Sequence, residues 1–92
     1  SFYIQMGKQK EARQNRLIRE IYNFVCVNPG VGSAAIYGYL AADLKMRNQG
    51  LSARKIGFFI PRYCKKYIRI EKRSEGRMYF PIESLDNKIE DV

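Results

Sequence analysis

The chain has 92 residues, which is enough for one domain but too short for a second hydrophobic core. Its 46% hydrophobic content is that of a folded protein, and its formal net charge of +8 points to an anionic partner such as nucleic acid. The sequence has no histidine, and its two cysteines, Cys26 and Cys64, are too few for a zinc site. It also has no Ser/His/Asp set, Cys/His pair or phosphate-binding glycine loop, so we expect neither an enzyme nor a cofactor or metal.

The positive charge is concentrated in one part of the chain. Residues 1–82 contain 16 of the 17 Lys and Arg residues but only five acidic residues, whereas residues 83–92 have a net charge of −3. We therefore divide the chain into an apolar N-terminal arm at 1–7, a folded domain at 8–82 and an acidic C-terminal tail at 83–92. No apolar run has transmembrane length and no signal peptide is recognisable, so we expect a soluble cytoplasmic protein.

A short extended arm and two helices are predicted in the first half of the chain. Apolar and polar residues alternate in residues 1–7, which predicts the extended arm before the domain. Residues 8–27 have a helical apolar period, and the Asn-Pro-Gly sequence at 28–30 is a helix stop. Ser33 is expected to cap a second helix at about 34–46.

The third predicted helix, at 52–66, has one apolar face and one cationic face. Ser52 is its expected N-cap, and Pro61 is expected to bend it because proline removes a backbone hydrogen bond. Its apolar positions recur at helical spacing and predict this buried face: Ile56, Phe59, Ile60, Tyr63, Cys64 and Tyr67. The other side carries four residues at every fourth position: Arg54, Phe58, Arg62 and Lys66. Phe58 is equally compatible with the core and with solvent.

A β-hairpin is predicted after the third helix. Two short alternating runs, at 67–72 and 77–82, flank a glycine-containing turn at 73–76 with a basic tip. In the tail, Leu85, Ile89 and Val92 are spaced for one or two helical turns.

Cys26 and Cys64 each fall on an apolar helical face, where a buried thiol is expected.

This order of elements, with a capped basic helix before a basic hairpin, resembles the winged-helix (winged helix-turn-helix) family over roughly residues 16–82. The resemblance implies an α+β, mostly helical fold with three helices and a β-hairpin wing. In that family the third helix enters the major groove of DNA, and the wing contacts the backbone or the minor groove. The small, basic, tyrosine-rich and histidine-free chain is also similar to small DNA-binding proteins of archaea and of their plasmids and viruses.

The charge pattern and the resemblance together predict a site for double-stranded DNA on the third helix and the hairpin tip. The expected DNA-binding residues are Ser52, Ala53, Arg54, Lys55, Phe58, Arg62, Lys65, Lys66, Lys72, Arg73 and Arg77. Residues near the start of the helix are expected to lie deepest in the groove, and the later cations to contact phosphates. A cationic face opposite an apolar stripe is often only a solvated surface. Here the third helix contains no carboxylate, whereas a merely solvated face usually mixes both signs.

The apolar arm and the tail stripe raise the question of assembly. They are more apolar than a monomer normally exposes, which favours a homodimer. Two-fold symmetry would place two recognition helices about 34 Å apart, one turn of DNA. The alternative is that both segments pack against the core of a single subunit.

The sequence therefore predicts sequence-specific DNA binding by a dimeric transcriptional regulator associated with the nucleoid. A second DNA role fits equally well: the site-binding adaptor of a plasmid partition system. A different class is a winged helix that docks an acidic protein inside a larger transcription or replication complex. RNA binding is less favoured because the chain has no RNP-like strand or GXXG loop. Membrane binding is also less favoured, because the basic residues do not flank an exposed apolar face.

Overall fold

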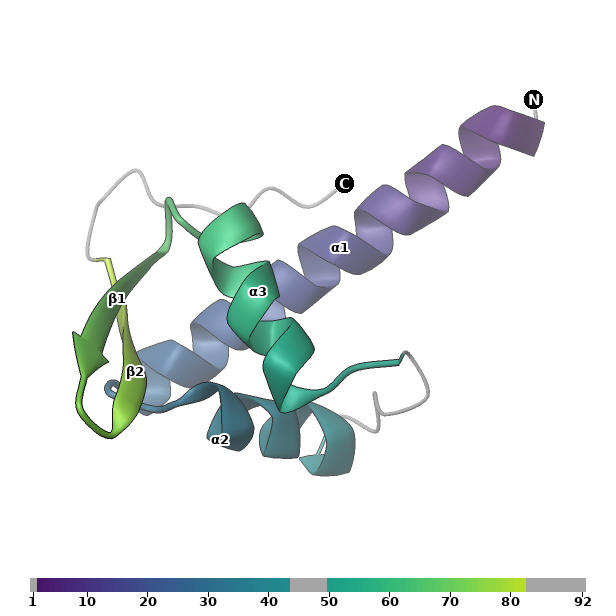
Figure 1. Ribbon diagram of the computed structural model, residues 1–92. Coiled ribbons are helices and arrows are strands. Elements are labelled where there is room, and N and C mark those ends of the chain that lie inside the picture. The colour runs from purple at the N-terminus through teal and green to yellow at the C-terminus, as the bar shows by residue number, and fades with distance from the viewer. Residues whose placement is uncertain (1, 44–49, 83–92) are drawn as a thin grey trace.

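The computed structural model describes residues 2–43 and 50–82, with side chains described at 10–42 and 50–82. Its elements are α1 (Phe2–Val27), α2 (Ser33–Gly38), the π-helical turn η1 (Tyr39–Asp43), α3 (Ala53–Tyr63), β1 (Ile68–Arg73) and β2 (Gly76–Pro81). The described part of the chain is thus a mostly helical α+β fold with three helices and one antiparallel hairpin, as the sequence predicted (Figure 1). The segment 47–51 between the second and third predicted helices lies partly outside the described residues, and the acidic tail at 83–92 lies wholly outside them.

The prediction of an extended arm at 1–7 is wrong. Helix α1 begins at Phe2 and runs without a break to Val27, and its first half projects from the rest of the fold (Figure 1). Extending an existing helix is easy because each added residue brings one backbone hydrogen bond, and a glycine inside it costs only about 1 kcal/mol. Gly7 therefore does not stop the helix, and a short alternation of apolar residues was too weak a signal to tell strand from helix.

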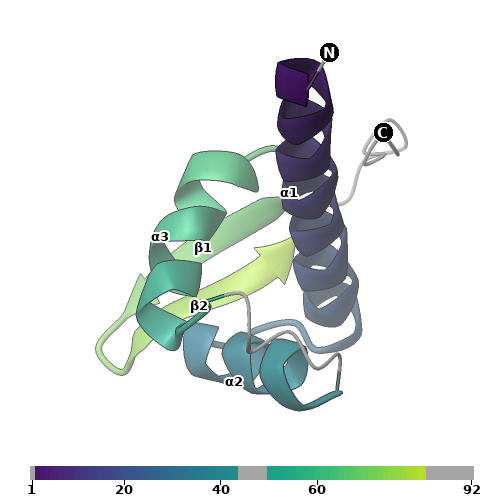
Figure 2. The same cartoon turned by 90° about the vertical axis from the view of Figure 1, so that its right-hand side faces the viewer.

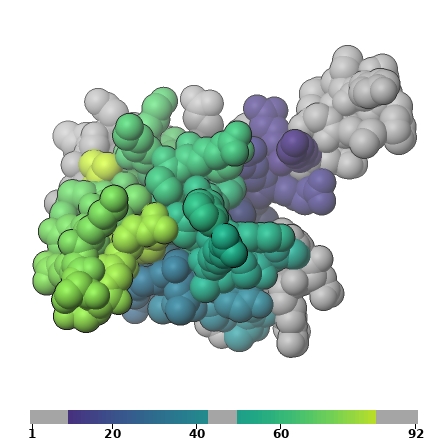
Figure 3. Space-filling model, in the orientation of Figure 1, coloured from purple at the N-terminus to yellow at the C-terminus, as the bar shows by residue number. Residues whose placement is uncertain are grey.

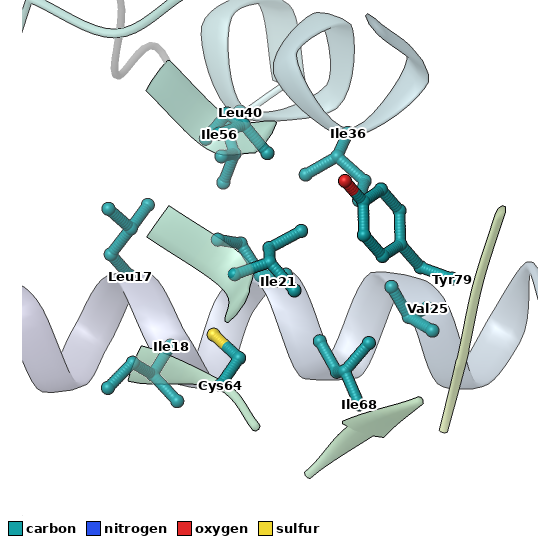
Figure 4. Close-up of a cluster of buried hydrophobic side chains, with 11 residues drawn as sticks. Leu17, Ile18, Ile21, Val25, Ile36, Leu40, Ile56, Cys64, Ile68 and Tyr79 are labelled. Atoms are coloured by element: carbon teal, nitrogen blue, oxygen red, sulfur yellow. The ribbon is translucent and has the colours of Figure 1, made fainter. Parts of the chain in front are cut away.

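The core forms where α1 meets the other elements. Every described helix and strand contributes to it, and its buried side chains are Leu17, Ile18, Ile21, Val25, Ile36, Leu40, Ile56, Ile60, Cys64, Ile68 and Tyr79. Figure 4 shows α1 side chains facing those of α2 and α3, with Tyr79 and Ile68 of the hairpin closing one end. The α1 members recur at helical spacing, so the predicted stripe is confirmed from Leu17 onward.

The stripe on α1 is narrower than the sequence suggested. Cys26 is exposed, so the prediction that its thiol is buried is wrong, whereas Cys64 is buried as expected. Neighbouring positions on a helix differ by about 100°, so Cys26 turns away from the core that encloses Val25. Both cysteines are free thiols.

The link between α1 and α2 follows the predicted stop but not the predicted cap. Helix α1 ends at Val27, and Gly30 adopts a φ of +89°, which glycine tolerates without strain. The N-cap of α2 is Gly32 without a side-chain hydrogen bond, so Ser33 is the first helical residue and not the cap. The α-helical part ends at Gly38, earlier than predicted, and η1 continues to Asp43.

The hairpin is tied to the helical part through this same link. Strands β1 and β2 pair antiparallel, from Ile68 opposite Pro81 to Arg73 opposite Gly76. Tyr79 then makes two backbone hydrogen bonds outside the hairpin: its N–H donates to the Val31 carbonyl at 2.9 Å, and its carbonyl accepts from the Gly30 N–H at 2.8 Å. The hairpin is therefore held against the α1–α2 link as well as by its own core residues.

Helix α3 starts where predicted and ends sooner. Ser52 caps it, but the helix ends at Tyr63 and not at 66. Cys64 leaves the helical conformation, and its carbonyl accepts hydrogen bonds from the N–H groups of Tyr67 and Ile68, both at 2.9 Å. These bonds turn the chain directly into β1, so residues 65–67 form a turn. Across the described ranges, no helix is sufficiently long and apolar to cross a membrane.

Candidate nucleic-acid interface

Helix α3 lies on the surface of the fold with one side in the core and the other in solvent. Ile56, Ile60 and Cys64 are spaced four residues apart and are fully buried. Arg54, Phe58 and Arg62 have the same spacing, are offset by two residues, and are exposed. The predicted separation into an inner apolar side and an outer cationic side is therefore present in the fold.

The start of α3 is fixed by two local hydrogen bonds. The Ser52 hydroxyl accepts from the Lys55 N–H at 3.1 Å, which satisfies one of the unpaired amides of the first helical turn. The Lys55 ammonium donates to the Gly50 carbonyl at 2.7 Å, and Gly50 has a φ of +71°. Of the residues predicted to contact DNA, Ser52 and Lys55 thus have structural roles at the helix start, and Ala53 is partly buried.

The structure decides the position of Phe58. Its side chain is 63% exposed, so it does not pack in the core, which the sequence left open. The Arg54 guanidinium carbon lies 5.8 Å from the centre of the Phe58 ring, one helical turn away. At the other end of α3, the Arg62 guanidinium carbon lies 5.3 Å from the ring of Tyr63. The prediction that Tyr63 is buried is wrong, because its side chain is 38% exposed while Phe59 is only partly buried against the core.

Lys65 and Lys66 are exposed but do not belong to α3. Because the helix ends at Tyr63, Lys66 does not continue the helical series of Arg54, Phe58 and Arg62 as the sequence suggested. The two lysines instead line a hollow of about 520 Å³ beside the end of α3, together with Ile18, Arg62, Tyr63 and Tyr67. Their charges remain next to that of Arg62.

The hairpin tip carries three predicted cations, and one of them is already paired. Lys72, Arg73 and Arg77 are all exposed. Glu71 accepts from Arg73 and from Arg69, each at 2.9 Å, and these hydrogen bonds hold the pKa of the Glu71 carboxyl below its usual value. This arrangement was not predicted, although the alternation Arg69-Glu71-Arg73 places all three side chains on one side of a strand.

Arg77 connects the hairpin to α3. Its Nη2 atom lies 3.1 Å from the position that a β-carbon on Gly57 would occupy, and its Cζ lies 4.0 Å from the same point. Apart from Gly57, its chain neighbours and the nearby backbone of α3, no other described atom lies within 4 Å of that position. The guanidinium therefore rests on α3 where the helix has no side chain, and Figure 3 shows the surfaces of α3 and the hairpin in contact.

Helix α3 and the hairpin tip project to the same side of the molecule. Figure 2 shows both on the left, with α1 on the right. We give the name basic face to six exposed cations of α3, of the turn that follows it and of the hairpin tip: Arg54, Arg62, Lys65, Lys66, Lys72 and Arg77. Among the side chains described, at 10–42 and 50–82, no carboxylate forms an ion pair with any of these six residues.

Among the described residues, no group of three or more potential His, Cys, Asp or Glu ligands is close enough to hold a metal ion. Burial raises the pKa of the Cys64 thiol to about 12, so this sulfur stays protonated and unreactive at neutral pH. Burial likewise raises the pKa of Tyr79.

No protein-family model matches the chain, and no curated protein or solved structure shows significant similarity to it.

Proposed function

We propose that this protein is a winged helix-turn-helix protein that binds double-stranded DNA in a sequence-dependent manner. The observation that carries the proposal is the basic face: an exposed helix and an adjoining hairpin, with six cations that no described carboxylate neutralises. A surface that only needs solvation would mix both signs. Concentrated positive charge on one face is instead the electrostatic pattern of nucleic-acid binding proteins.

Helix α3 has the size and exposure that a recognition helix needs. Its 11 residues span about 16 Å, and the major groove of B-DNA, about 12 Å wide, admits an α-helix. Arg54 and Phe58, in the first half of the helix, would face the base edges. Arg62, Lys65 and Lys66 would face phosphates, where a point charge is sufficient.

The hairpin would act as the wing. Lys72 and Arg77 are the cations at its tip that are available to a DNA strand, because Arg73 is held by Glu71. The Arg77 guanidinium of the hairpin lies against Gly57 of α3, so that one DNA segment could meet both elements. Contacts of this kind fix orientation on the duplex and make affinity depend on salt.

A homodimer remains part of the proposal. Helix α1 is 26 residues long, about 39 Å, and among its described side chains, from Lys10 onward, the buried ones begin at Leu17. We assign the second copy of the chain to the half of α1 that projects from the rest of the fold. A two-fold dimer would present two α3 helices to two half-sites about 34 Å apart.

The decisive experiment is binding of labelled duplex DNA across a salt series. We expect log affinity to fall linearly with log salt concentration. Arg54→Ala should reduce discrimination between sequences, and Arg77→Ala should weaken binding to all sequences alike. Arg16→Ala is the matched control, because it removes the same charge from an exposed position on α1, outside the basic face.

The alternatives predict different results. DNase protection that spreads outward from one site would favour a partition adaptor over a regulator of transcription. Absence of DNA binding even at low salt would refute the DNA proposal, and the basic face should then be tested against acidic proteins.

A further inference from the structure

The ring of Phe58 does not pack against the core of the described fold. It is 63% exposed on the second turn of α3, between the exposed cations Arg54 and Arg62. Leaving a phenyl ring in water forgoes the free energy that its burial would contribute. A ligand that covers the ring would recover this free energy, and its chemistry must suit both an apolar ring and the cations around it.

One guanidinium group, that of Arg54, lies beside this ring, and a second, that of Arg77, lies over the preceding residue, Gly57. Arg54 precedes Phe58 by four residues and Gly57 by three, so it neighbours both positions on the helix surface. Its guanidinium carbon is 5.8 Å from the ring centre, and the Arg77 guanidinium covers Gly57. The outer side of α3 therefore presents a bidentate hydrogen-bond donor, Arg54, and an apolar ring, Phe58, on consecutive turns of the helix.

The major groove presents a matching pair of groups. Guanine offers two acceptors, N7 and O6, that suit an arginine fork, and the C5 methyl of thymine is the apolar group on the base-pair edges. One helical turn rises 5.4 Å, and successive base pairs are about 3.4 Å apart, so the two side chains would reach bases one or two pairs apart.

We infer that Arg54 and Phe58 form a subsite for a guanine and a thymine within two base pairs of each other, with Phe58 recognising the thymine methyl. The inference rests on the proposed function and extends it, because it assigns a base to each side chain. Arg77, seated on Gly57, flanks this subsite and contacts the adjoining phosphate.

The test uses the full chain and begins with selection of duplexes from a random library. The selected sites should contain a guanine and a thymine at this spacing. Each thymine in turn is then replaced by deoxyuridine, which pairs identically and lacks only the methyl group. At the position that Phe58 contacts, this should reduce wild-type affinity about fourfold, the value of one buried methyl.

Two variants make the assignment specific. Phe58→Ala should bind the thymine and deoxyuridine duplexes equally, whereas Tyr63→Ala, which removes another exposed aromatic of α3, should keep the wild-type preference for thymine. Arg54→Ala should lose its response to 7-deazaguanine at the neighbouring position, since that base lacks the N7 acceptor. Thermal melting should show that Phe58→Ala folds normally, because the ring makes no core contact.

The unfavourable outcomes are distinguishable. If wild type selects a site but binds its deoxyuridine forms equally well at every position, the inference is overturned and DNA binding stands. If Phe58→Ala keeps the thymine preference but no longer dimerises, the ring belongs to an interface between copies and the inference is overturned. If no duplex is enriched, the proposed sequence-specific function fails, and the subsite fails with it.

Discussion

Substitutions at Gly57 test two properties separately: the stability of helix α3 and the contact between α3 and the Arg77 side chain of the hairpin. Glycine inside a helix costs about 0.5–1 kcal/mol relative to alanine, because it loses more backbone freedom on folding. The new methyl of Gly57→Ala would lie 3.1 Å from Nη2 of Arg77, a few tenths of an ångström too close. The atom in the way is the end of a flexible side chain, so a small shift relieves the contact. We therefore expect Gly57→Ala to raise the free energy of unfolding by about 0.5–1 kcal/mol, or the Tm by about 2–8 °C.

Gly57→Leu places a larger side chain at the same position. Leucine also favours the helix, but its side chain would occupy the space in which the Arg77 guanidinium now lies. The hairpin cation would be displaced from α3 while the helix itself remained intact. DNA affinity should fall as it does in Arg77→Ala, and the slope of log affinity against log salt should decrease by about 1.

Circular dichroism melting and DNA titrations over a salt series together test both expectations. The double variant Gly57→Leu/Arg77→Ala should bind no more weakly than Arg77→Ala alone, because both changes remove one interaction. A lower Tm for Gly57→Ala would show that the Arg77 contact is rigid and that the reasoning is wrong. Full DNA affinity in Gly57→Leu would equally refute the role of the Gly57–Arg77 contact.

Three further expectations follow from the described residues. Ser52→Ala should lower the free energy of unfolding by about 1 kcal/mol in denaturant titrations, since it removes the N-cap of α3, and a Ser52→Asp variant that retains the cap should not. In a thiol-labelling assay at pH 8, Cys26 should react at once and Cys64 only after unfolding, because burial raises the Cys64 pKa to about 12; two fast thiols in the native protein would contradict this. Glu71→Gln should release its two arginine partners and steepen the slope of log DNA affinity against log salt concentration by about one to two. Glu75→Gln, an equal charge change at the hairpin turn, should release no arginine, and equal effects of the two variants would contradict the expectation for Glu71.

Local rules were sufficient for most of the elements. The cap at Ser52, the stop after Val27 and the hairpin turn before Gly76 each depend on a few neighbouring residues, and each lies within one residue of its predicted place. The same rules failed at the start of α1 and the end of α3. At the start of α1, the alternation of apolar residues over 1–7 favoured an extended segment, whereas the helical period of the residues that follow favoured a helix. The end of α3 is set by hydrogen bonds to the Cys64 carbonyl from the N–H groups of Tyr67 and Ile68, which lie in the turn before β1 and at its first residue.

The order of residues along the chain is enough to show which positions are apolar, which helix is cationic, and that this helix contains no carboxylate. Those properties follow from composition and from a period of 3.6 residues, and they need no knowledge of packing. The exposure of Phe58 and Tyr63, the solvent-facing position of Cys26, and the contact of Arg77 with Gly57 twenty positions away all depend on how the elements pack in three dimensions. Helical periodicity gives the direction of a buried face but not its width, which is set by the elements that pack against it. Contacts between distant segments depend on how the hairpin is anchored to the α1–α2 link, and no local pattern encodes that anchoring.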